Sequence, residues 1–481
     1  MKKVFTVILL LATAVSLFAQ EEAPKKKEGK TGWNFGPLPA IGYSSDLGWH
    51  YGALSDIYYY GDGSTYPEYR FKFNVEAFWY SKGNSVYHLF FDSKYLIPGI
   101  RFSAAVSYFG NKTYSFYGFN GASPYIPDAD RIATLENDFL GNKHMGFYLM
   151  QRDILRVTTC FQGRFGDTNL GWAAGLTYNY FNTGNAQSKF KQGKKNVKET
   201  LNGLSLYDLY VRTGLIPEDE AKGGHHIELK AGFVYDTRDF ENNPTRGTNL
   251  EVYAFGSYDF IQKRNHYVKV AVHLKQFFPI VEDKLVFGGH MAFQGLLAGK
   301  APFYSLQSVQ SINMKQINTE GLGSTCTLRG TTSNRLMGDS YAWGNFELRW
   351  TFIRFDWIKQ HWALVLNPFF DMGAVVRPYN ADAFEALKKN MSDTNFRNTE
   401  LYGLLSSELP TEDSSGKALF KEGMTVYDAI QAANVRKLHM SAGVGLHVIM
   451  NQNFNISFEF GKAFDPNDGL WGMNVGLNFI F

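Results

Sequence analysis

The sequence predicts an all-β protein, namely a transmembrane antiparallel β-barrel of about 16 strands with long extracellular loops. The first observation is composition: aromatic residues make up 16% of the 481 residues and charged residues only 19%, whereas about a quarter of a typical soluble chain is charged. The second is a mean hydropathy of −0.25 with no apolar run of about 20 residues beyond the N-terminal segment, which argues against membrane-spanning helices. The third is an alternation of apolar and polar residues along most of the chain, the pattern of strands with two different faces.

Charge and cysteine content exclude two other classes of protein. Lys and Arg total 48 against 45 Asp and Glu, a net charge of +3 that falls to +1 without Lys2 and Lys3. A nucleic-acid-binding protein carries a marked basic excess, so we expect no nucleic-acid partner. Two cysteines, Cys160 and Cys326, are too few for a disulfide scaffold.

The N-terminal segment has the features of an export signal. A basic start at residues 1–3 precedes an apolar stretch at residues 4–18 and the small residue Ala19. The alternative, a membrane anchor helix, is disfavoured because a stretch of about 15 residues is short for a span of about 20. We therefore expect a signal peptide (1–19), a flexible periplasmic leader (20–34) and an outer-membrane β-barrel (35–481), with both termini in the periplasm of the bacterial cell.

The C-terminal stretch shows the alternation most clearly, with polar or small residues between the members of an apolar set. That set is Met473, Val475, Leu477, Phe479 and Phe481. Alternating stretches in this chain run about 9–12 residues, as in tilted strands that cross a bilayer, whereas strands in soluble proteins average about 5–6 residues. An open sheet edge in lipid would leave backbone groups unsatisfied, so the sheet must close into a barrel.

Sixteen strands are predicted from this alternation. They lie near residues 49–60, 69–80, 85–95, 99–109, 144–151, 155–165, 169–181, 226–236, 247–258, 266–277, 284–295, 341–353, 361–376, 437–449, 453–461 and 471–481. A seventeenth candidate at 35–44 is interpreted as an N-terminal tether or plug, because single-chain bacterial barrels have an even number of strands.

The strand count also assigns the connections to the two sides of the membrane. Tight turns at 81–84, 166–169 and 450–453 fall on the periplasmic side with the termini. Long polar connections at 182–225, 296–340 and 377–435 fall on the extracellular side. The long segment 110–143 is an exception, which this count places on the periplasmic side or inside the lumen.

Four short segments carry a family resemblance when they are taken in order. They are residues 235–239 followed by 244–247, residues 328–331 (Leu-Arg-Gly-Thr), residues 369–373 (Phe-Phe-Asp-Met-Gly), and residues 441–446 with the terminal aromatic strand. Together with residues 116–121 they resemble the BamA/TamA superfamily, also called the bacterial surface antigen family, over about residues 35–481. The first segment, with Asp236, Arg238, Asp239 and Gly247, resembles a strand end and periplasmic turn of that family.

The resemblance implies an ion pair between a loop and the lumen. In the family, an Arg-Gly signature on the sixth outer loop folds into the barrel, where the Arg pairs with acidic residues on two strands. This assigns Arg329 and Gly330 to the loop tip, with Glu347 and Asp371 as the partners of Arg329. Alternation agrees, since each carboxylate falls on the face opposite its apolar neighbours. The alternative is that Arg329 is a solvated loop residue.

Two departures from the family pattern concern the loop tip and the N-terminus. Family members usually carry an aromatic residue at the position of Thr331. Many relatives also carry periplasmic POTRA domains before the barrel, whereas residues 20–33 are far fewer than the roughly 40 that an independent domain needs. We expect that whatever receives a client in those relatives is missing here or supplied by another chain.

Other motifs give weaker signals. Terminal Phe479 and Phe481 match the signal by which assembly machinery accepts outer-membrane proteins. The pair His225-His226 could bind a metal but fits the entry to a strand better, and residues 465–469 fit a turn better than a calcium loop. Since nucleotide, zinc and nucleophile motifs are not found, we expect no catalytic residues, no metal, no cofactor and no enzymatic activity.

Two functions lead at this point, and the remaining possibility is an enzyme or a binding surface built on the long outer loops. The resemblance implies an assembly or translocation factor that inserts or moves client proteins through a weak lateral seam between the first and last strands. The alternative is an outer-membrane channel or structural barrel with no assembly role. The expected partners are outer-membrane lipid, the periplasmic assembly machinery and, for the first function, client outer-membrane proteins or accessory lipoproteins.

Overall fold

The structure is a computed structural model. It describes residues 30–44, 48–66, 68–81, 83–119, 148–192, 195–200, 205–241, 243–258, 265–309, 321–323, 327–357, 360–408, 411, 422–432, 437–450, 454–469, 471–477, 479 and 481. The signal peptide expected at 1–19 and most of the expected leader lie outside the described residues.

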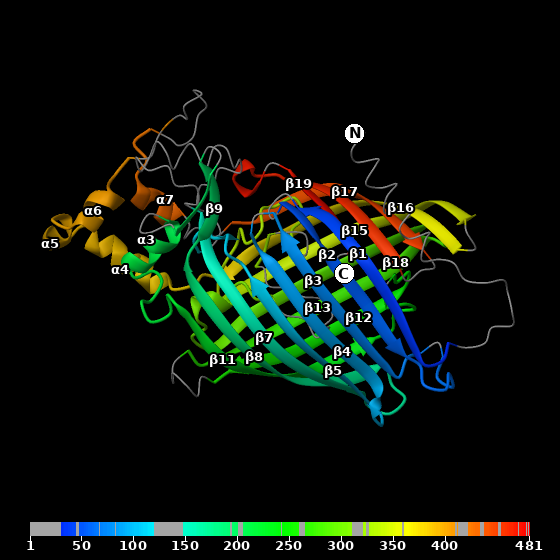
Figure 1. The fold of residues 1–481 in the computed structure, drawn as a ribbon. Coiled ribbons are helices and arrows are strands. Elements are labelled where there is room, and N and C mark those ends of the chain that lie inside the picture. The colour runs from blue at the N-terminus through cyan, green and yellow to red at the C-terminus, as the bar shows by residue number, and fades with distance from the viewer. Residues whose placement is uncertain are drawn as a thin grey trace.

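One large antiparallel sheet dominates the fold (Figure 1). Its strands are β1 (Trp33–Ser44), β2 (Gly48–Tyr59), β3 (Phe71–Tyr80), β4 (Ser85–Ile97), β5 (Ile100–Gly110), β6 (Tyr114–Ser115), β7 (Leu149–Arg164), β8 (Leu170–Asn185), β11 (Gly223–Asp236), β12 (Gly247–Ser257), β13 (Tyr267–Val281), β14 (Leu285–Gly299), β15 (Ser340–Trp357), β16 (Gln360–Arg377), β17 (His439–Met450), β18 (Phe454–Ala463) and β19 (Gly472–Leu477). A separate hairpin contains β9 (Gln187–Gln192) and β10 (Lys195–Thr200).

The strand order returns to its starting point. Strands adjacent in the chain pair with each other, with two exceptions: β5 pairs with β7, and β8 pairs with β11 across the β9–β10 hairpin. The strand β1 pairs with β19 as well as with β2. The two-residue β6 lies beside β7, so 16 of the 17 strands in the sheet form the ring. The structure is therefore the all-β antiparallel barrel that the sequence predicts.

The two faces of the sheet explain the alternation in the sequence. On β13, Lys269, Ala271 and His273 are buried, while Val268 just before them is exposed and Val270 and Val272 between them are partly exposed. On β11, Leu229 is 68% exposed although it is strongly apolar. Polar residues thus face the interior and apolar residues face outward, which suits a lipid surrounding. No helix in the described part of the chain is long and apolar enough to cross a membrane.

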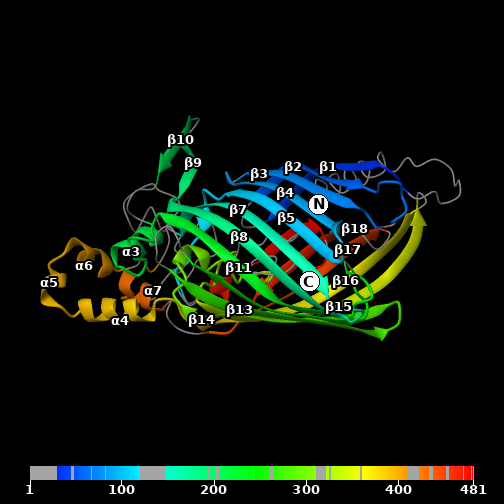
Figure 2. The same ribbon diagram turned by 90° about the horizontal axis from the view of Figure 1, so that it is seen from below.

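Helices occur in the long connections at one end of the barrel (Figures 1 and 2). They are α3 (Leu206–Arg212), α4 (Ala381–Asn390), α5 (Thr394–Arg397), α6 (Glu400–Leu405) and α7 (Val426–Ala432), with 3-10 turns η1 (Phe303–Ser305) and η2 (Pro466–Asp468). One cluster of buried aromatic and aliphatic side chains joins these connections to the barrel wall. Its members include Phe119, Tyr210, Phe303, Tyr379, Phe384 and Ile430.

The structure corrects two strand assignments. The segment 35–44 is not a tether or plug but most of β1, which pairs with β2 along its whole length. The strand predicted at 155–165 and the last residues of the one predicted at 144–151 belong to one strand, β7, while residues 144–147 lie outside the described residues. The strand β1 adds one strand to the prediction, and the merging into β7 removes one. The ring therefore has the predicted 16 strands, although they are not the 16 that were predicted.

The corrected count moves two connections. The long segment after β5 now falls at the same end of the ring as the other long connections, and not on the side of the short turns. The tight turn at 81–84 also falls at that end, opposite to the prediction, because β1 adds one crossing before it.

Candidate functional site

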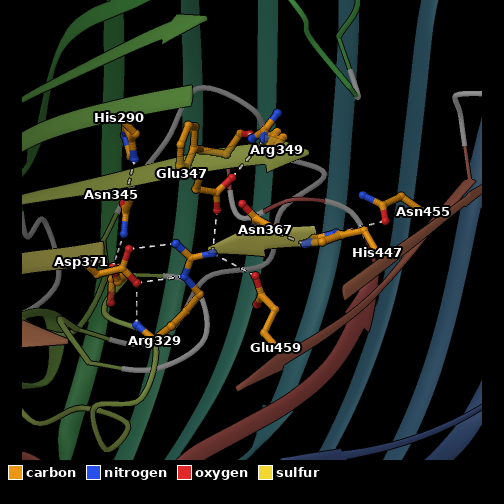
Figure 3. Close-up of polar contacts among 12 residues, drawn as sticks. His290, Arg329, Asn345, Glu347, Arg349, Asn367, Asp371, His447, Asn455 and Glu459 are labelled. Atoms are coloured by element: carbon orange, nitrogen blue, oxygen red, sulfur yellow. Dashed lines mark hydrogen bonds and ion pairs between the residues drawn. The ribbon is translucent and has the colours of Figure 1, made fainter. Parts of the chain in front are cut away.

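The tip of the connection between β14 and β15 lies inside the barrel, where Arg329 meets carboxylates from three strands (Figure 3). Its Nη1 atom lies 2.6 Å from Glu347 Oε1 on β15 and 2.9 Å from Glu459 Oε1 on β18. Its Nε and Nη2 atoms donate to the two oxygens of Asp371 on β16, at 2.9 and 2.8 Å. The guanidinium therefore bridges three of the strands that precede the seam between β19 and β1.

Burial makes these contacts strong. Arg329 is 2% exposed, and the side chains of Glu347 and Asp371 have no exposed surface. The guanidinium also stacks on Phe369, with its carbon 3.7 Å from the ring centroid. Bidentate Arg–carboxylate pairs fix geometry as well as charge, so this cluster sets the position of the loop tip.

The structure brings together the three ionic residues that the sequence assigned to this site, and it adds Glu459. That residue was not among the predicted partners. Its signal was present, since it lies between the outward-facing Phe458 and Phe460 on an alternating strand. A second cation also joins the cluster: Arg349 Nε donates to Glu347 Oε2 at 3.0 Å.

Gly330 lets the loop tip touch the backbone of the last strands. Its φ is +83°, and a Cβ there would lie 2.5 Å from the carbonyl carbon of Gly461 on β18. A Cβ on Gly472 of β19 would lie 2.9 Å from Gly330 Cα. Only glycine combines this conformation with such close approach. The neighbouring Thr331, where the family usually has an aromatic residue, is buried.

A second set of contacts ties the same loop to the connection between β18 and β19. Arg335 Nε lies 3.1 Å from Asp468 Oδ1, and His439 Nδ1 lies 2.6 Å from Asp468 Oδ2. All three side chains are buried. Burial raises the pKa of Asp468, but the hydrogen bond with His439 and the charge of Arg335 act against it, and the net pKa lies below its ordinary value. No pattern in the sequence predicts this contact.

The predicted turn motif forms a compact turn between β11 and β12. Arg238 binds Asp236 through two bonds, Nε to Oδ1 at 2.9 Å and Nη2 to Oδ2 at 2.7 Å. Asp239 accepts hydrogen bonds from the main-chain N–H groups of Thr245 and Arg246. The Thr245 hydroxyl also donates to Asp239. Burial raises the pKa of Asp239, but the hydrogen bonds from the Thr245 hydroxyl and from the two N–H groups lower it, and the net pKa lies below its ordinary value. Gly247 has a φ of +102° and packs against the Thr237 carbonyl.

The C-terminal aromatics do not continue the outward face on which the sequence placed them. Met473 is exposed, whereas Phe479 and Phe481 are 5% and 8% exposed and contact the lumenal Arg349. The reason is that β19 ends at Leu477, so the alternation of the strand no longer governs the residues that follow. In both ribbon views the C-terminal label lies within the outline of the barrel (Figures 1 and 2).

The seam between the first and last strands is thin. In the described residues β1 and β19 share one residue pair, Ser44 with Asn474. The neighbouring interfaces are longer, with six pairs between β18 and β19 and twelve between β1 and β2. Most of the β1 edge that faces β19 therefore has no strand partner in this part of the structure.

The weaker motifs take structural roles. His225 bonds Tyr178 and stacks on Tyr180, with ring centroids 4.4 Å apart, at the start of β11. Residues 465–469 form the turn η2, in which Asp465 accepts from Asn467 N. Within the described ranges, no group of three or more His, Cys, Asp or Glu side chains could hold a metal ion.

Comparisons with known proteins agree with this architecture. The model of the Omp85 superfamily domain matches residues 70–480. Among solved structures, CdiB from Escherichia coli aligns with a TM-score of 0.50 and 9% identity, over 95% of this chain and 67% of that one. BamA from Haemophilus ducreyi, lacking POTRA domains 1–3, aligns with a TM-score of 0.49 and 13% identity, over 98% of this chain and 78% of that one. A search of curated proteins gave no match.

The family match covers most of the chain and includes the loop tip, its carboxylate partners and the last strands. Its range covers the barrel from β3 onward, and β1 and β2 precede it. The chain belongs to the Omp85 superfamily and is a bacterial outer-membrane β-barrel protein.

Proposed function

We propose that this protein is an insertion or translocation factor for outer-membrane proteins, and that a client strand enters through the seam between β1 and β19. The observation that carries the proposal is that the described residues form a single residue pair at this seam. An unpaired strand edge is a template for another strand. Opening a short interface also costs less than opening one of the longer interfaces elsewhere in the ring.

Two prolines further weaken the seam. Tyr60 N donates to the carbonyl of Gly32 at 2.9 Å, directly before the continuous register between β1 and β2. The N–H and C=O groups of successive residues point to opposite sides of an antiparallel strand. Since Gly32 directs its carbonyl toward the β2 side, the even-numbered residues of β1 direct their main-chain groups toward β2. Odd-numbered residues, including Pro37 and Pro39, point theirs toward the seam. Proline has no N–H to donate, and within sheets it is confined to edges and bulges.

The other wall of the seam is held from inside. The loop tip binds Glu459 of β18 through Arg329 and packs Gly330 against β18 and β19. These contacts favour a mechanism in which β16 to β19 keep their arrangement and the β1 edge receives the client. With both termini in the periplasm, a client delivered by periplasmic partners would arrive at the end of the barrel that carries the short turns.

The test combines depletion of the protein with a reversible lock on the seam. Depletion should lower the amounts of other outer-membrane proteins. Rescue should fail with the pair Ser44→Cys and Asn474→Cys under oxidising conditions and return on reduction. The matched control lock, Ala53→Cys with Ala77→Cys, joins paired residues of β2 and β3 away from the seam and should rescue in both conditions. Both pairs are made with Cys160 and Cys326 replaced by Ser.

Two results would overturn this proposal. One is an outer membrane with undiminished levels of all other proteins after depletion. The other is full rescue by the oxidised seam lock. Stable open pores of the purified protein in planar bilayers, together with either result, would favour the alternative of a channel with no assembly role, for which the polar lumen is suited.

A further inference from the structure

The last residues of the chain occupy a lumenal site that is built around Arg349. Its Nη2 atom donates to the main-chain oxygen of Phe481 at 3.1 Å. Its guanidinium carbon lies 3.8 Å from the ring centroid of Phe479 and 5.3 Å from that of Phe481. Arg349 is 3% exposed. One charged group thus contacts both aromatic rings and the main chain of the same short segment.

Further aromatic and aliphatic side chains complete the site. The ring of His447 stacks on Phe479 at 4.2 Å, and Phe479 packs with Val365 and Ile449. Phe481 lies between His290 and Phe277, with ring centroids 5.4 and 5.9 Å away. These residues come from β13, β14, β15, β16 and β17. The segment therefore crosses from the β19 side of the lumen to the strands on the other side of Arg349.

Arg349 also retains a donor that the described residues do not use. Its buried Nη1 atom has no hydrogen-bond partner in this part of the structure, while Nε is held by Glu347. A buried charged donor without a partner is costly. This Nη1 donor could bind one more hydrogen-bond acceptor than the described part of the tail supplies.

The register of the seam explains why the tail leaves the barrel wall. Ser44 faces Asn474 across the seam. If β19 continued in this antiparallel register, the residue numbers of every facing pair would sum to 518. Phe479 would then lie opposite Pro39, and Phe481 opposite Pro37. These are positions where β1 directs its main-chain groups toward the seam. Because proline lacks N–H, the carbonyls of Phe479 and Phe481 would find no donor there, a large cost in lipid. In the lumen, Arg349 supplies a donor to Phe481.

We propose that the lumenal surface around Phe277, His290, Arg349 and His447 is a binding site for an extended segment with aromatic residues two apart. The chain's own Phe479 and Phe481 occupy it, directed there by Pro37 and Pro39. A client whose C-terminal strand carries the same aromatic pattern competes for the site; this last step rests on the function proposed above. Occupancy by the client would release the tail of the barrel while the client lies at the seam.

Cross-linking tests whether the tail is docked. The full chain, with Cys160 and Cys326 replaced by Ser, carries Phe481→Cys with His290→Cys, and oxidation should join most molecules. The matched control pairs Phe481→Cys with Met291→Cys, the next residue on β14, which is 55% exposed on the outer face, and should not cross-link. Adding Pro37→Val and Pro39→Val restores two donors to β1 and should reduce the His290 cross-link severalfold. Equal cross-linking to both positions, or a yield unchanged by the proline substitutions, would overturn the proposal.

Peptide binding tests the site itself. The probe is a labelled peptide of residues 473–481, added to purified protein refolded in detergent. The variant Phe479→Ala with Phe481→Ala should bind it about tenfold more tightly than the unchanged chain, a difference of about 1.4 kcal/mol, because its own tail no longer competes. A peptide with both phenylalanines replaced by alanine should bind neither protein.

Equal affinity of the variant and the unchanged chain for the peptide would exclude competition and refute the site. Heat-modifiable gel migration checks that the variant is folded. Both assays use purified protein without any client. A negative result here therefore leaves the depletion and seam-lock experiments unaffected, and a failure of those experiments leaves the peptide result standing.

Discussion

Arg329 carries one positive charge, and three carboxylates surround it within 2.9 Å. Replacing it by alanine removes the cation that pairs with the buried carboxylates of Asp371 and Glu459, which costs about 3–5 kcal/mol. We expect Arg329→Ala to lose heat-modifiable migration at a lower denaturant concentration. Arg329→Lys should lose this migration at a denaturant concentration between those of Arg329→Ala and the unchanged chain, since an ammonium keeps the charge but cannot reproduce the bidentate contacts. The control Arg354→Ala, at an exposed position of β15, should not change the midpoint; equal midpoints for Arg329→Ala and the unchanged chain would refute the structural role.

Gly330 is tested by adding a single methyl group. In Gly330→Ala the positive φ alone costs about 1–2 kcal/mol, and the new Cβ would overlap Gly461, so the loop tip must leave β18. We expect lower stability in denaturant and weaker rescue of a depleted strain. Gly184→Ala is the control, because a Cβ on Gly184 of β8 meets nothing within 4 Å. Loss of stability of the same size in both variants would show that the close approach at Gly330 is not the cause.

At the residue scale, the sequence predicted the ion cluster where alternation and motif acted together. Glu347 and Asp371 lie on long strands of regular period, so their faces follow from parity. Glu459 obeys the same rule but stands in no quoted motif. The pair of Arg335 and Asp468 has no such signal, because both residues lie in irregular segments whose approach is set by the tertiary fold.

The element that pH should weaken is the connection between β18 and β19. Because the folded pKa of Asp468 is depressed, its carboxylate stabilises the fold above the unfolded pKa of about 3.9. This contribution is lost as pH falls through the lower folded pKa. At pH 7, Asp468→Asn should cost about 3–5 kcal/mol, since it leaves the buried Arg335 unpaired, and the gap to the unchanged chain should close toward pH 3.

The measurement is denaturant unfolding of both proteins in detergent over this pH range. Asp167→Asn, in the exposed turn between β7 and β8, is the control and should match the unchanged chain at every pH. A gap between Asp468→Asn and the unchanged chain that stays constant from pH 7 to pH 3 would contradict the assigned role of the Asp468 charge.

Element boundaries show where sequence reasoning failed and why. Residues 35–44 contain two prolines and two glycines, a composition that argues against a central strand. They nevertheless form β1, because a strand at the seam needs main-chain hydrogen bonds along its whole length only on one side, here the side that faces β2. The sequence predicts two strands where the structure has only β7, because Arg152 and Asp153 interrupt the apolar pattern. Arg152 is buried, with its guanidinium bonded to the carbonyl of Tyr304 from the loop that enters the barrel.

Over the whole molecule, the two ends of the barrel have different constructions. Short turns join the strands at one end. At the other, an aromatic and aliphatic cluster extends from the barrel wall through the loops to α4, α6 and α7. Within it, Phe119 packs against Tyr210 and Tyr379, with ring centroids 5.2 and 4.8 Å apart. Close-packed rings of this kind exclude water, so the long connections should oppose ion flow through the lumen.

Removing the helices tests this closure. Replacing residues 381–432 by a short Gly-Ser linker takes away Phe384, Leu387 and Ile430 from the cluster, while the paired strands of the ring are untouched. We expect the intact protein to show few open events in planar bilayers and the deletion variant to show frequent ones, with heat-modifiable migration retained. Replacing 187–200, which includes the separate β9–β10 hairpin, is the control and should leave conductance as in the intact protein. If the intact protein already conducts steadily, or if deleting the helices changes nothing, then the loop cluster does not close the barrel, and the polar lumen would be better explained as a channel.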